Sequence, residues 1–549
     1  MDCKNFAGLF LGLVVLAIVP LQARHKPLQA DYVIVGVGTA GATMAKKLTD
    51  DKKTSVVALH INENLTQDPE IKFSVNGLTT VLSAIIGPPF YESGSSIPQP
   101  NADGRDILWS MALPLGGASS INAGAWCRGT NQVYSQWEAI AGPEWSVNNI
   151  LNEYKKLEKY KGKTTNKSAR GFHGPLDVLQ ENPPSKFATK FTSAMIKATG
   201  YPFVLDYNNP MTPIGVSSSF QYTKKGKEGA LRVSSATAFL NKKVMTPSGY
   251  GVNGRKLRVL FNSPALRTIW EGNKAVGVEY LSKGKTKKVY AKKGVIVCAG
   301  LRSSVFLLQS GVGPEALLTS LKIPVKVNNP NVGQGMADQP AVVVAFSANP
   351  LDISPNPNIF FSQIAWLPSP TGDQNTREFR LATLNPLPGL AFCLLDLVQA
   401  RSRGSVSISS SNPLDPPVID NGALSNPEDL ALFQQGLQVY VSAIAKAINN
   451  MDASYKLLYP SQAILNDTNL LTDFIKQNVN SNLSYQSHCR MAPLNQGGVV
   501  DGTGHVYGVT GLLVADDSIL PTPMDGSTMA TAYLAASTIF RQLQSQQVK

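Results

Sequence analysis

The segment "SYQSHCRMA" at residues 484–492 contains His488, one of only five histidines in the chain. Imidazole changes its charge near neutral pH, so a histidine is well suited to take a proton from a substrate. His488 is therefore the first candidate for a catalytic base. The alternative is a histidine that only hydrogen-bonds a backbone carbonyl, and the sequence leaves both interpretations open.

A second candidate site is the glycine-rich turn "GVGTAG". It follows the apolar run "DYVIV" and precedes "TMAKKL", whose apolar residues recur at helical spacing. Glycines between a strand and a helix let the backbone approach a pyrophosphate, and the helix N-terminus attracts its negative charge. The pattern predicts a dinucleotide-binding loop. Its residues are Gly36, Gly38, Thr39, Ala40 and Gly41.

The next predicted strand, "TSVVAL", is followed directly by His60, with Glu63 three residues later. In a dinucleotide-binding unit an acidic residue at the end of this strand accepts a hydrogen bond from a ribose hydroxyl. A neutral imidazole can accept one hydrogen bond but lacks the charge of a carboxylate. His60 is thus predicted to contact the cofactor and to hold it less tightly than an acid would.

Three long stretches, "LPLGGASSINAGAWCRG", "VIVCAGLRSSVFLLQSGVGP" and "GGVVDGTGHVYGVTGLLVADDSILP", resemble the glucose–methanol–choline (GMC) family of flavin oxidoreductases. Shorter matches lie between them in the family's order, at residues 231–240, 270–280, 321–340 and 402–420. The resemblance extends from about Asp31 to the end of the chain. It implies FAD as the cofactor.

The resemblance also assigns FAD-binding residues beyond the glycine loop. The run "LGGASSIN" consists of small residues whose backbone N–H groups can approach phosphate or flavin, and an asparagine amide both donates and accepts hydrogen bonds. The acid that ends "GLLVAD" resembles the family's acidic residue beside the FAD chain. The residues implied are Gly116, Gly117, Ser120, Asn122, Ala123 and Asp516.

The family's catalytic pair raises a question. Its motif places the base at Ser484 and the His or Asn partner at Ser527, and a serine hydroxyl cannot accept a proton at neutral pH. A local shift of the loop could bring His488 into the base position, with Asp525 or Ser527 as its partner. Alternatively, the fold keeps FAD for other chemistry, such as a lyase reaction, or has lost catalysis and serves a binding or structural role.

The helices and strands that must position these residues indicate a mixed α/β (α+β) protein of two domains. The glycine loop lies in a strand–helix–strand unit, and the resemblance implies a Rossmann-like FAD/NAD(P)-binding domain and a discontinuous substrate-binding domain on an antiparallel sheet. The predicted FAD-binding domain comprises residues 31–150, 229–345 and 490–549, and the substrate-binding domain comprises residues 151–228 and 346–489.

Several individual elements are predicted from pattern. Residues 425–449 begin with helix-start residues and continue with apolar side chains at helical spacing, which predicts a long amphipathic helix. Near the C-terminus, "GLLVAD" predicts a strand and residues 529–542 a helix. The stretches 62–104 and 350–372 are rich in Pro and Gly and are predicted to be loops over the surface or the active site.

The length and composition indicate a globular protein of more than one domain. The 549 residues exceed what a single core supports, and 43% hydrophobic with 16% charged residues is typical of a globular protein. The net charge of +13 is dispersed, so nucleic acid or another polyanion is an allowed but not a favoured partner. After Cys3, four cysteines remain, which leave room for one disulfide, and no spacing suggests zinc or another metal.

The N-terminus predicts export. An apolar run from Phe6 to Val19 is shorter than a membrane span and matches the core of a signal peptide over residues 1–23; an uncleaved anchor is the alternative. We expect a secreted or extracytoplasmic protein without a transmembrane span after cleavage. Four glycosylation sequons agree with a glycoprotein. They begin at Asn64, Asn166, Asn466 and Asn482.

Together these observations predict a GMC-type, FAD-dependent oxidoreductase that acts on the CH–OH group of an alcohol by hydride transfer to flavin N5. The electron acceptor, oxygen or another molecule, is left open. The alternative is a GMC-fold protein that has lost catalysis, or one that uses flavin for a non-redox reaction.

Overall fold

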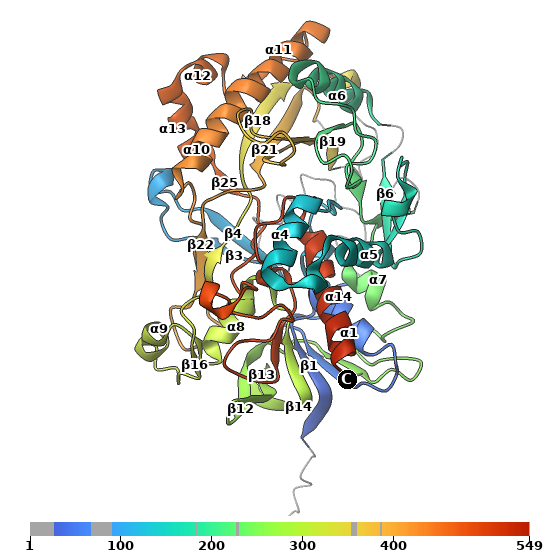
Figure 1. The fold of residues 1–549 in the computed structure, drawn as a ribbon, viewed down its shortest axis with the longest axis vertical. Helices are drawn as coiled ribbons and strands as arrows, with labels where there is room; N and C mark the ends of the chain where they lie inside the picture. Colours follow the sequence, from blue (N-terminus) through green and yellow to red (C-terminus); the bar gives the residue numbers. More distant parts are fainter. Residues whose placement is uncertain are drawn as a thin grey trace, which may run out of the picture.

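A computed structural model describes residues 27–66, 90–181, 184–226, 230–352, 360–384 and 387–547 (Figure 1). The predicted signal peptide, residues 1–23, lies outside the described residues. Two seven-stranded sheets dominate the fold, one in the lower half and one in the upper half of Figure 1.

The first sheet has the strand order β11-β2-β1-β14-β13-β12, with β26 also paired to β14. Its strands are β1 Leu28–Val35, β2 Val56–Leu59, β11 Leu257–Leu260, β12 Ala265–Glu271, β13 Lys274–Ser282, β14 Lys285–Val297 and β26 Leu512–Val514. β1, α1 (Thr39–Leu48) and β2 form the predicted strand–helix–strand unit, since β1 pairs in parallel with β2. The long strand β14 pairs with β13 through its first half and with β26 through its last residues.

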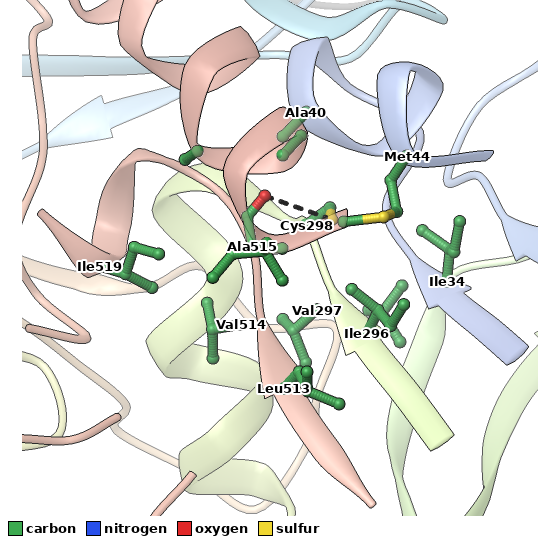
Figure 2. Packing of buried hydrophobic residues seen from close by; sticks show 14 of the residues in the cluster. Ile34, Ala40, Met44, Ile296, Val297, Cys298, Leu513, Val514, Ala515 and Ile519 are labelled. Atoms are coloured by element: carbon green, nitrogen blue, oxygen red, sulfur yellow. Dashed lines mark hydrogen bonds between the residues drawn. The ribbon is translucent and has the colours of Figure 1, made fainter. Parts of the chain in front are cut away.

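Apolar packing explains why this sheet forms. The central strands are buried on both faces, as expected for parallel strands covered by helices. Figure 2 shows Ile34, Ile296 and Leu513, from three neighbouring strands, in the same buried cluster as Met44 of α1. Helix α14 (Thr528–Gln547) packs beside α1 and confirms the predicted C-terminal helix, which extends further than residue 542.

The second sheet is antiparallel, with the order β24-β18-β21-β20-β19-β7 and β25 paired to β18. Its strands are β7 Gly215–Ser217, β18 Pro340–Ser347, β19 Phe361–Leu367, β20 Phe379–Leu384, β21 Leu390–Leu397, β24 Leu457–Tyr459 and β25 Asn480–Ser481. Side chains alternate across it: Phe379 and Leu381 pack under the helices of one face, whereas Arg380 and Ala382 point to the other face. Strand β18 of this sheet begins at Pro340, and β7 joins the sheet from residues 215–217.

Helices cover the outer face of the second sheet. They are α6 Lys186–Thr199, α10 Pro427–Gln435, α11 Ser442–Met451, α12 Gln462–Asn466 and α13 Thr468–Asn478. The predicted helix over 425–449 is present as α10 and α11, joined by a π-helical turn at Gly436–Val441. The loop predicted over 350–372 is wrong in part, because β19 lies within it and all seven of its residues are buried.

The remaining elements connect the two sheets or extend their edges. The helices are α4 Asn131–Ala141, α5 Val147–Leu157, α7 Ser235–Phe239, α8 Ser303–Gln309 and α9 Glu315–Ser320. The short strands are β3 Tyr91–Ser95, β4 Leu108–Ala112, β5 Glu158–Lys161, β6 Leu176–Gln180, β8 Gln221–Tyr222, β9 Lys224–Lys225, β10 Leu231–Arg232, β15 Val312–Gly313, β16 Val327–Asn328, β17 Gln334–Met336, β22 Gly404–Ser407 and β23 Val418–Asp420.

Three further expectations concern bonds, metals and membranes. Cys127, Cys298, Cys393 and Cys489 are all free and buried, so the allowed disulfide is not formed among them. Within the described ranges no cluster of His, Cys, Asp and Glu could hold a metal ion. No helix in that part of the chain is long and apolar enough to cross a membrane.

Candidate functional site

A cavity of about 830 Å³ lies between the two sheets. One end is lined by the loops that follow β1, β2, β14 and β26, which are the carboxyl ends of parallel strands, where α/β proteins bind their ligands. The other end is lined by the second sheet and by residues 480–485. The cavity therefore joins the predicted cofactor loop to the predicted substrate domain.

The glycine loop forms the floor of this cavity. Gly36 has a φ of +89°, and a side chain on Gly41 would come within 2.0 Å of the carbonyl oxygen of Gly36, so the turn requires both glycines. Gly36, Gly38, Thr39 and Ala40 line the cavity, whereas Gly41 lies beneath the turn and packs helix against strand. The backbone at the start of α1 is thus open to a ligand.

A second small-residue loop lies against the first. The Gly116 N–H donates to the carbonyl of Val37 at 2.9 Å, and Thr39 Oγ1 donates to the carbonyl of Gly116 at 3.2 Å. A side chain on Gly117, whose φ is +56°, would meet the Cα of Gly38 at 2.8 Å. The two loops consequently act as one surface, and glycine is required where they touch.

The residues predicted from the second loop divide into two groups. Gly117, Asn122 and Ala123 line the cavity. Gly116 and Ser120 do not: they support the loop from behind, with Ser120 Oγ donating to a backbone carbonyl at 2.6 Å. The Oδ1 atom of Asn122 accepts the N–H of Gly124, so the group that this side chain can offer a ligand is its Nδ2 amide.

His60 lies in the cavity wall after β2, as predicted. Its side chain is buried edge-on against Phe261, and burial lowers its pKa to about 4, so the imidazole is neutral. Among the described residues its Nε2 atom has no hydrogen-bond partner. A buried polar atom without a partner is rare, and here a bound hydroxyl group would satisfy it.

Asp516 lines the same end of the cavity, after β26. Its two carboxylate oxygens accept four hydrogen bonds, from the N–H of Gly300, the Ser303 hydroxyl, and both the N–H and the hydroxyl of Ser518. Burial raises its pKa, and burial together with the charge of Asp516 raises the pKa of neighbouring Asp517 further. Asp516 is therefore held rigidly at the cavity wall, and Asp517 is the member of the pair that favours the protonated form.

The two predicted catalytic serines both line the cavity. The Ser484 N–H donates to Oδ1 of Asp338 at 3.0 Å, and the Ser527 N–H donates to the carbonyl of Cys127 at 2.9 Å. These backbone bonds fix the positions from which the hydroxyl groups act. Both can orient an oxygen of a substrate.

His488 requires a correction, because it is absent from the described residues that line the cavity. Ser487 has a φ of +68°, and the N–H groups of Ser487 and Cys489 donate to carbonyls of Asp517 and Ser518. This pairing directs His488 into the core, where it is 1% exposed and its Nδ1 lies 3.0 Å from Oγ of Ser304. Burial lowers its pKa to about 3, so it is neutral and secluded from a substrate.

The loop shift that would bring His488 into the base position is also absent from the structure. Asp525, its suggested partner, accepts hydrogen bonds from the backbone and the hydroxyl of Thr130 and does not reach the cavity lining. Of the described lining residues, the carboxyl and imidazole side chains are His60, Asp516 and Asp517. All three lie at the end of the first sheet, so Ser484 and Ser527 have no such base beside them in the lining.

The substrate-domain end of the cavity contains residues that sequence reasoning missed. They are Phe360, Phe361, Arg380, Leu394 and, from the loop after β25, Tyr485. The signal that could have found Arg380 is the alternation of β20, in which one charged residue stands at an inward position of an otherwise uncharged strand. Of the four sequons, the one at Asn482 also reaches the cavity lining, whereas Asn466 is exposed.

Comparison with known proteins gives consistent matches. The family model described as GMC oxidoreductase matches residues 30–341 in its N-terminal part and 400–536 in its C-terminal part. An uncharacterized GMC-type oxidoreductase of Mycobacterium tuberculosis is 30% identical over 538 residues, which is 92% of this chain and 97% of the relative. An oxygen-dependent choline dehydrogenase of Brucella anthropi is 27% identical, over 91% and 93% of the two chains.

Solved structures show the same fold. Pyridoxine 4-oxidase from Mesorbium loti superposes with a TM-score of 0.83 at 23% identity, over 94% of this chain and 99% of that one. A formate oxidase from Aspergillus oryzae, studied for the modification of its FAD, superposes with a TM-score of 0.82 at 19% identity, over 95% and 99% of the two chains. At these identities the likeness concerns architecture.

Proposed function

Because the chain belongs to the GMC oxidoreductase family, we propose that it oxidises the CH–OH group of a small alcohol. The observation that carries this proposal is the single cavity that joins the glycine loop to Ser484, Ser527 and the inner face of the second sheet. A cofactor bound at one end and a substrate at the other would meet within it.

FAD is the cofactor, and the residues of the cavity fit it. The backbone of Gly36–Ala40 at the start of α1 would hold the pyrophosphate, and the unpartnered Nε2 of His60 would bond a ribose hydroxyl. Gly117, Asn122 and Asp516 would contact the remainder of the molecule. When bound, FAD supplies the acceptor for a hydride.

The chain's own contribution is to position the alcohol. Ser484 and Ser527 would hydrogen-bond the substrate oxygen from opposite segments of the chain, and their backbone bonds to Asp338 and Cys127 keep them in place. Apolar residues of the second sheet exclude bulk water from the reacting carbon. Positioning of this kind lowers the entropic cost of reaction.

Removal of the hydroxyl proton of the alcohol is the difficult step of this reaction. No carboxylate or imidazole lies beside the two serines in the described lining, so the proton would pass to water in the cavity rather than to a side chain. General-base catalysis contributes roughly 10²–10⁴-fold to a rate. We therefore expect slow turnover at neutral pH that rises with hydroxide concentration.

The same observation favours a second candidate function, in which the protein retains FAD without oxidising alcohols. Without a base at position 484, a bound flavin could serve other chemistry or a binding role. This alternative predicts a stable flavoprotein that no alcohol reduces.

An absorption spectrum separates the two. The purified protein is recorded from about 300 to 550 nm, before and after anaerobic addition of a panel of primary and secondary alcohols at several pH values. Loss of the two flavin bands with an alcohol, faster at higher pH, supports oxidation. Bands that persist with every alcohol at every pH support the second function.

A further inference from the structure

One arginine at the substrate end of the cavity has unused hydrogen-bond donors. Arg380 stands at an inward position of β20, is 6% exposed and lines the cavity together with Phe360, Phe361 and Leu394. The backbone of Phe361 is fixed by Tyr222, whose hydroxyl bonds both its N–H and its carbonyl. The guanidinium is therefore set in a rigid apolar wall.

The bonding of Arg380 is incomplete. Its Nε donates to Oδ2 of Asp396, the directly opposite residue on β21, at 2.9 Å. The other carboxylate oxygen of Asp396 is buried without a partner, and the described residues supply no hydrogen bond to either terminal nitrogen of Arg380. The contact is thus single, and the planar edge formed by Nη1 and Nη2 remains for a ligand.

Two other arginines of this protein have guanidinium groups with several hydrogen bonds. Arg377, three residues earlier, donates to the carbonyls of Pro213, Arg128 and Tyr207 at 2.7–3.0 Å. Arg302, at the cofactor end of the cavity, pairs with both carboxylate oxygens of Glu92 and with two carbonyls. Arg380 differs from both, because only one of its three nitrogens is bonded to the described part of the protein.

We propose that Arg380 is a specificity-determining residue that binds a carboxylate on the substrate, so that the alcohol oxidised is a hydroxy acid with an apolar segment between its two polar groups. This inference rests on the proposed function and names its substrate class. A guanidinium edge matches the two oxygens of a carboxylate in a planar, bidentate arrangement. Phe360, Phe361 and Leu394 would contact the apolar segment.

Asp396 has a positioning role in this arrangement. Its Oδ2 holds the Nε of Arg380 from the opposite strand, and its charge keeps the buried guanidinium ionised. The described lining of the cavity also contains neutral amide and hydroxyl side chains from residues 480–485 and Ser527. A carboxylate entering here meets one cation and no competing acid in the lining.

Ligand binding tests the proposal without turnover. Benzoate and benzamide have the same shape and differ in charge, so their dissociation constants are measured with the FAD-loaded protein by calorimetry. We expect benzoate to bind about tenfold or more tightly than benzamide, since hydrogen bonds to charged groups are the stronger ones. Equal affinities for the two ligands would overturn the proposal.

Two variants extend the test. Arg380→Lys keeps the charge but removes the planar edge, and should lose most of the preference for benzoate. The double variant Arg380→Met/Asp396→Leu removes the ion pair in one step and leaves no buried charge alone, so it is expected to fold. In it benzoate and benzamide should bind within about twofold of each other. A double variant that keeps the preference for benzoate contradicts the proposal.

The result can be separated from the proposed function. Preferential binding of benzoate supports the role of Arg380 even if no alcohol is oxidised. In that case only the proposed alcohol oxidation is contradicted. If alcohols are oxidised, 4-(hydroxymethyl)benzoate should have a lower KM than 4-(hydroxymethyl)benzamide, at similar kcat. Equal KM values would overturn the role of Arg380 and leave alcohol oxidation standing.

Discussion

Nδ1 of His488 lies 3.0 Å from Oγ of Ser304, in a buried turn whose flanking N–H groups, at Ser487 and Cys489, donate to carbonyls of Asp517 and Ser518. The imidazole is neutral there because burial lowers its pKa to about 3. His488, the first candidate for a catalytic base in the sequence, is thus a buried side chain that packs in the core. Its effect should be visible in stability rather than in turnover.

Acid should destabilise the protein through His488. Its pKa is about 3 when folded and about 6.5 when unfolded, so stability is complete above pH 6.5 and falls as the pH decreases toward 3. Lowering the pH from 7 to 5 should therefore reduce the free energy of unfolding by about 2 kcal/mol through this group. Urea unfolding at both pH values should show a smaller loss for His488→Gln than for the wild type. His173→Gln, at an exposed site, should leave the loss unchanged; an equal effect of both variants would refute the assignment.

Placing a base at position 484 should accelerate alcohol oxidation. Ser484→His puts an imidazole in the cavity lining, where the described residues offer no base, and general-base catalysis contributes roughly 10²–10⁴-fold. Anaerobic stopped-flow measures the rate of flavin reduction, which should now rise through the ordinary imidazole pKa of about 6.5. Ser481→His, also in the lining, controls for the mere presence of an imidazole. No gain over Ser484→Ala, with FAD bound, would show that proton removal is not the missing step.

An acid in place of His60 should strengthen FAD binding. A carboxylate accepts a stronger, charge-assisted hydrogen bond than the neutral imidazole, a gain of about 1 kcal/mol or roughly fivefold in Kd. His60→Glu and His60→Gln are compared by titrating the apoprotein with FAD and following flavin fluorescence. The Glu variant should bind more tightly than the Gln variant. The reverse order would mean that His60 does not face the ribose.

The contact between the two glycine loops should be intolerant of a methyl group. Gly117→Ala would place a Cβ 2.8 Å from the Cα of Gly38 and should cost about 1–3 kcal/mol beyond the backbone strain, together with a weaker hold on FAD. Gly272→Ala is the matched control, because Gly272 has a similar φ of +51° and open space around it. Thermal unfolding and FAD titration should separate the two variants. Equal losses would assign the effect to backbone strain alone.

Local pattern was sufficient for the first strand–helix–strand unit at the cofactor end of the molecule. The strand–helix–strand unit and its glycine loop are contiguous in sequence, so the apolar periodicity and the glycine spacing predict both the fold and the place of His60. Asp516 follows a short apolar strand, but its place beside the cofactor was implied by the family resemblance and not by local pattern. These residues are positioned by their immediate neighbours along the chain.

The substrate end depends on contacts between distant segments. The direction of His488 is set by pairing with residues 517–519, and nothing within its own segment indicates that pairing. Strand β19 was not predicted, because the proline and glycine residues on either side of it indicate a loop. Arg380 forms its ion pair only because the pairing of β20 with β21 places Asp396 opposite to it. Sequence pattern alone cannot supply such pairings.

β14 joins strands from both ends of the chain, since β1 lies on one side of it and β26 on the other. The central sheet can therefore close only after the residues of β26 have been synthesised, and Asp516 and Ser527 follow that strand in the sequence. Long-range closure of this kind is slow, and until it occurs the end of β14 is an unpaired edge open to other chains. Chains that stop before β26 should leave this edge exposed and be prone to aggregate.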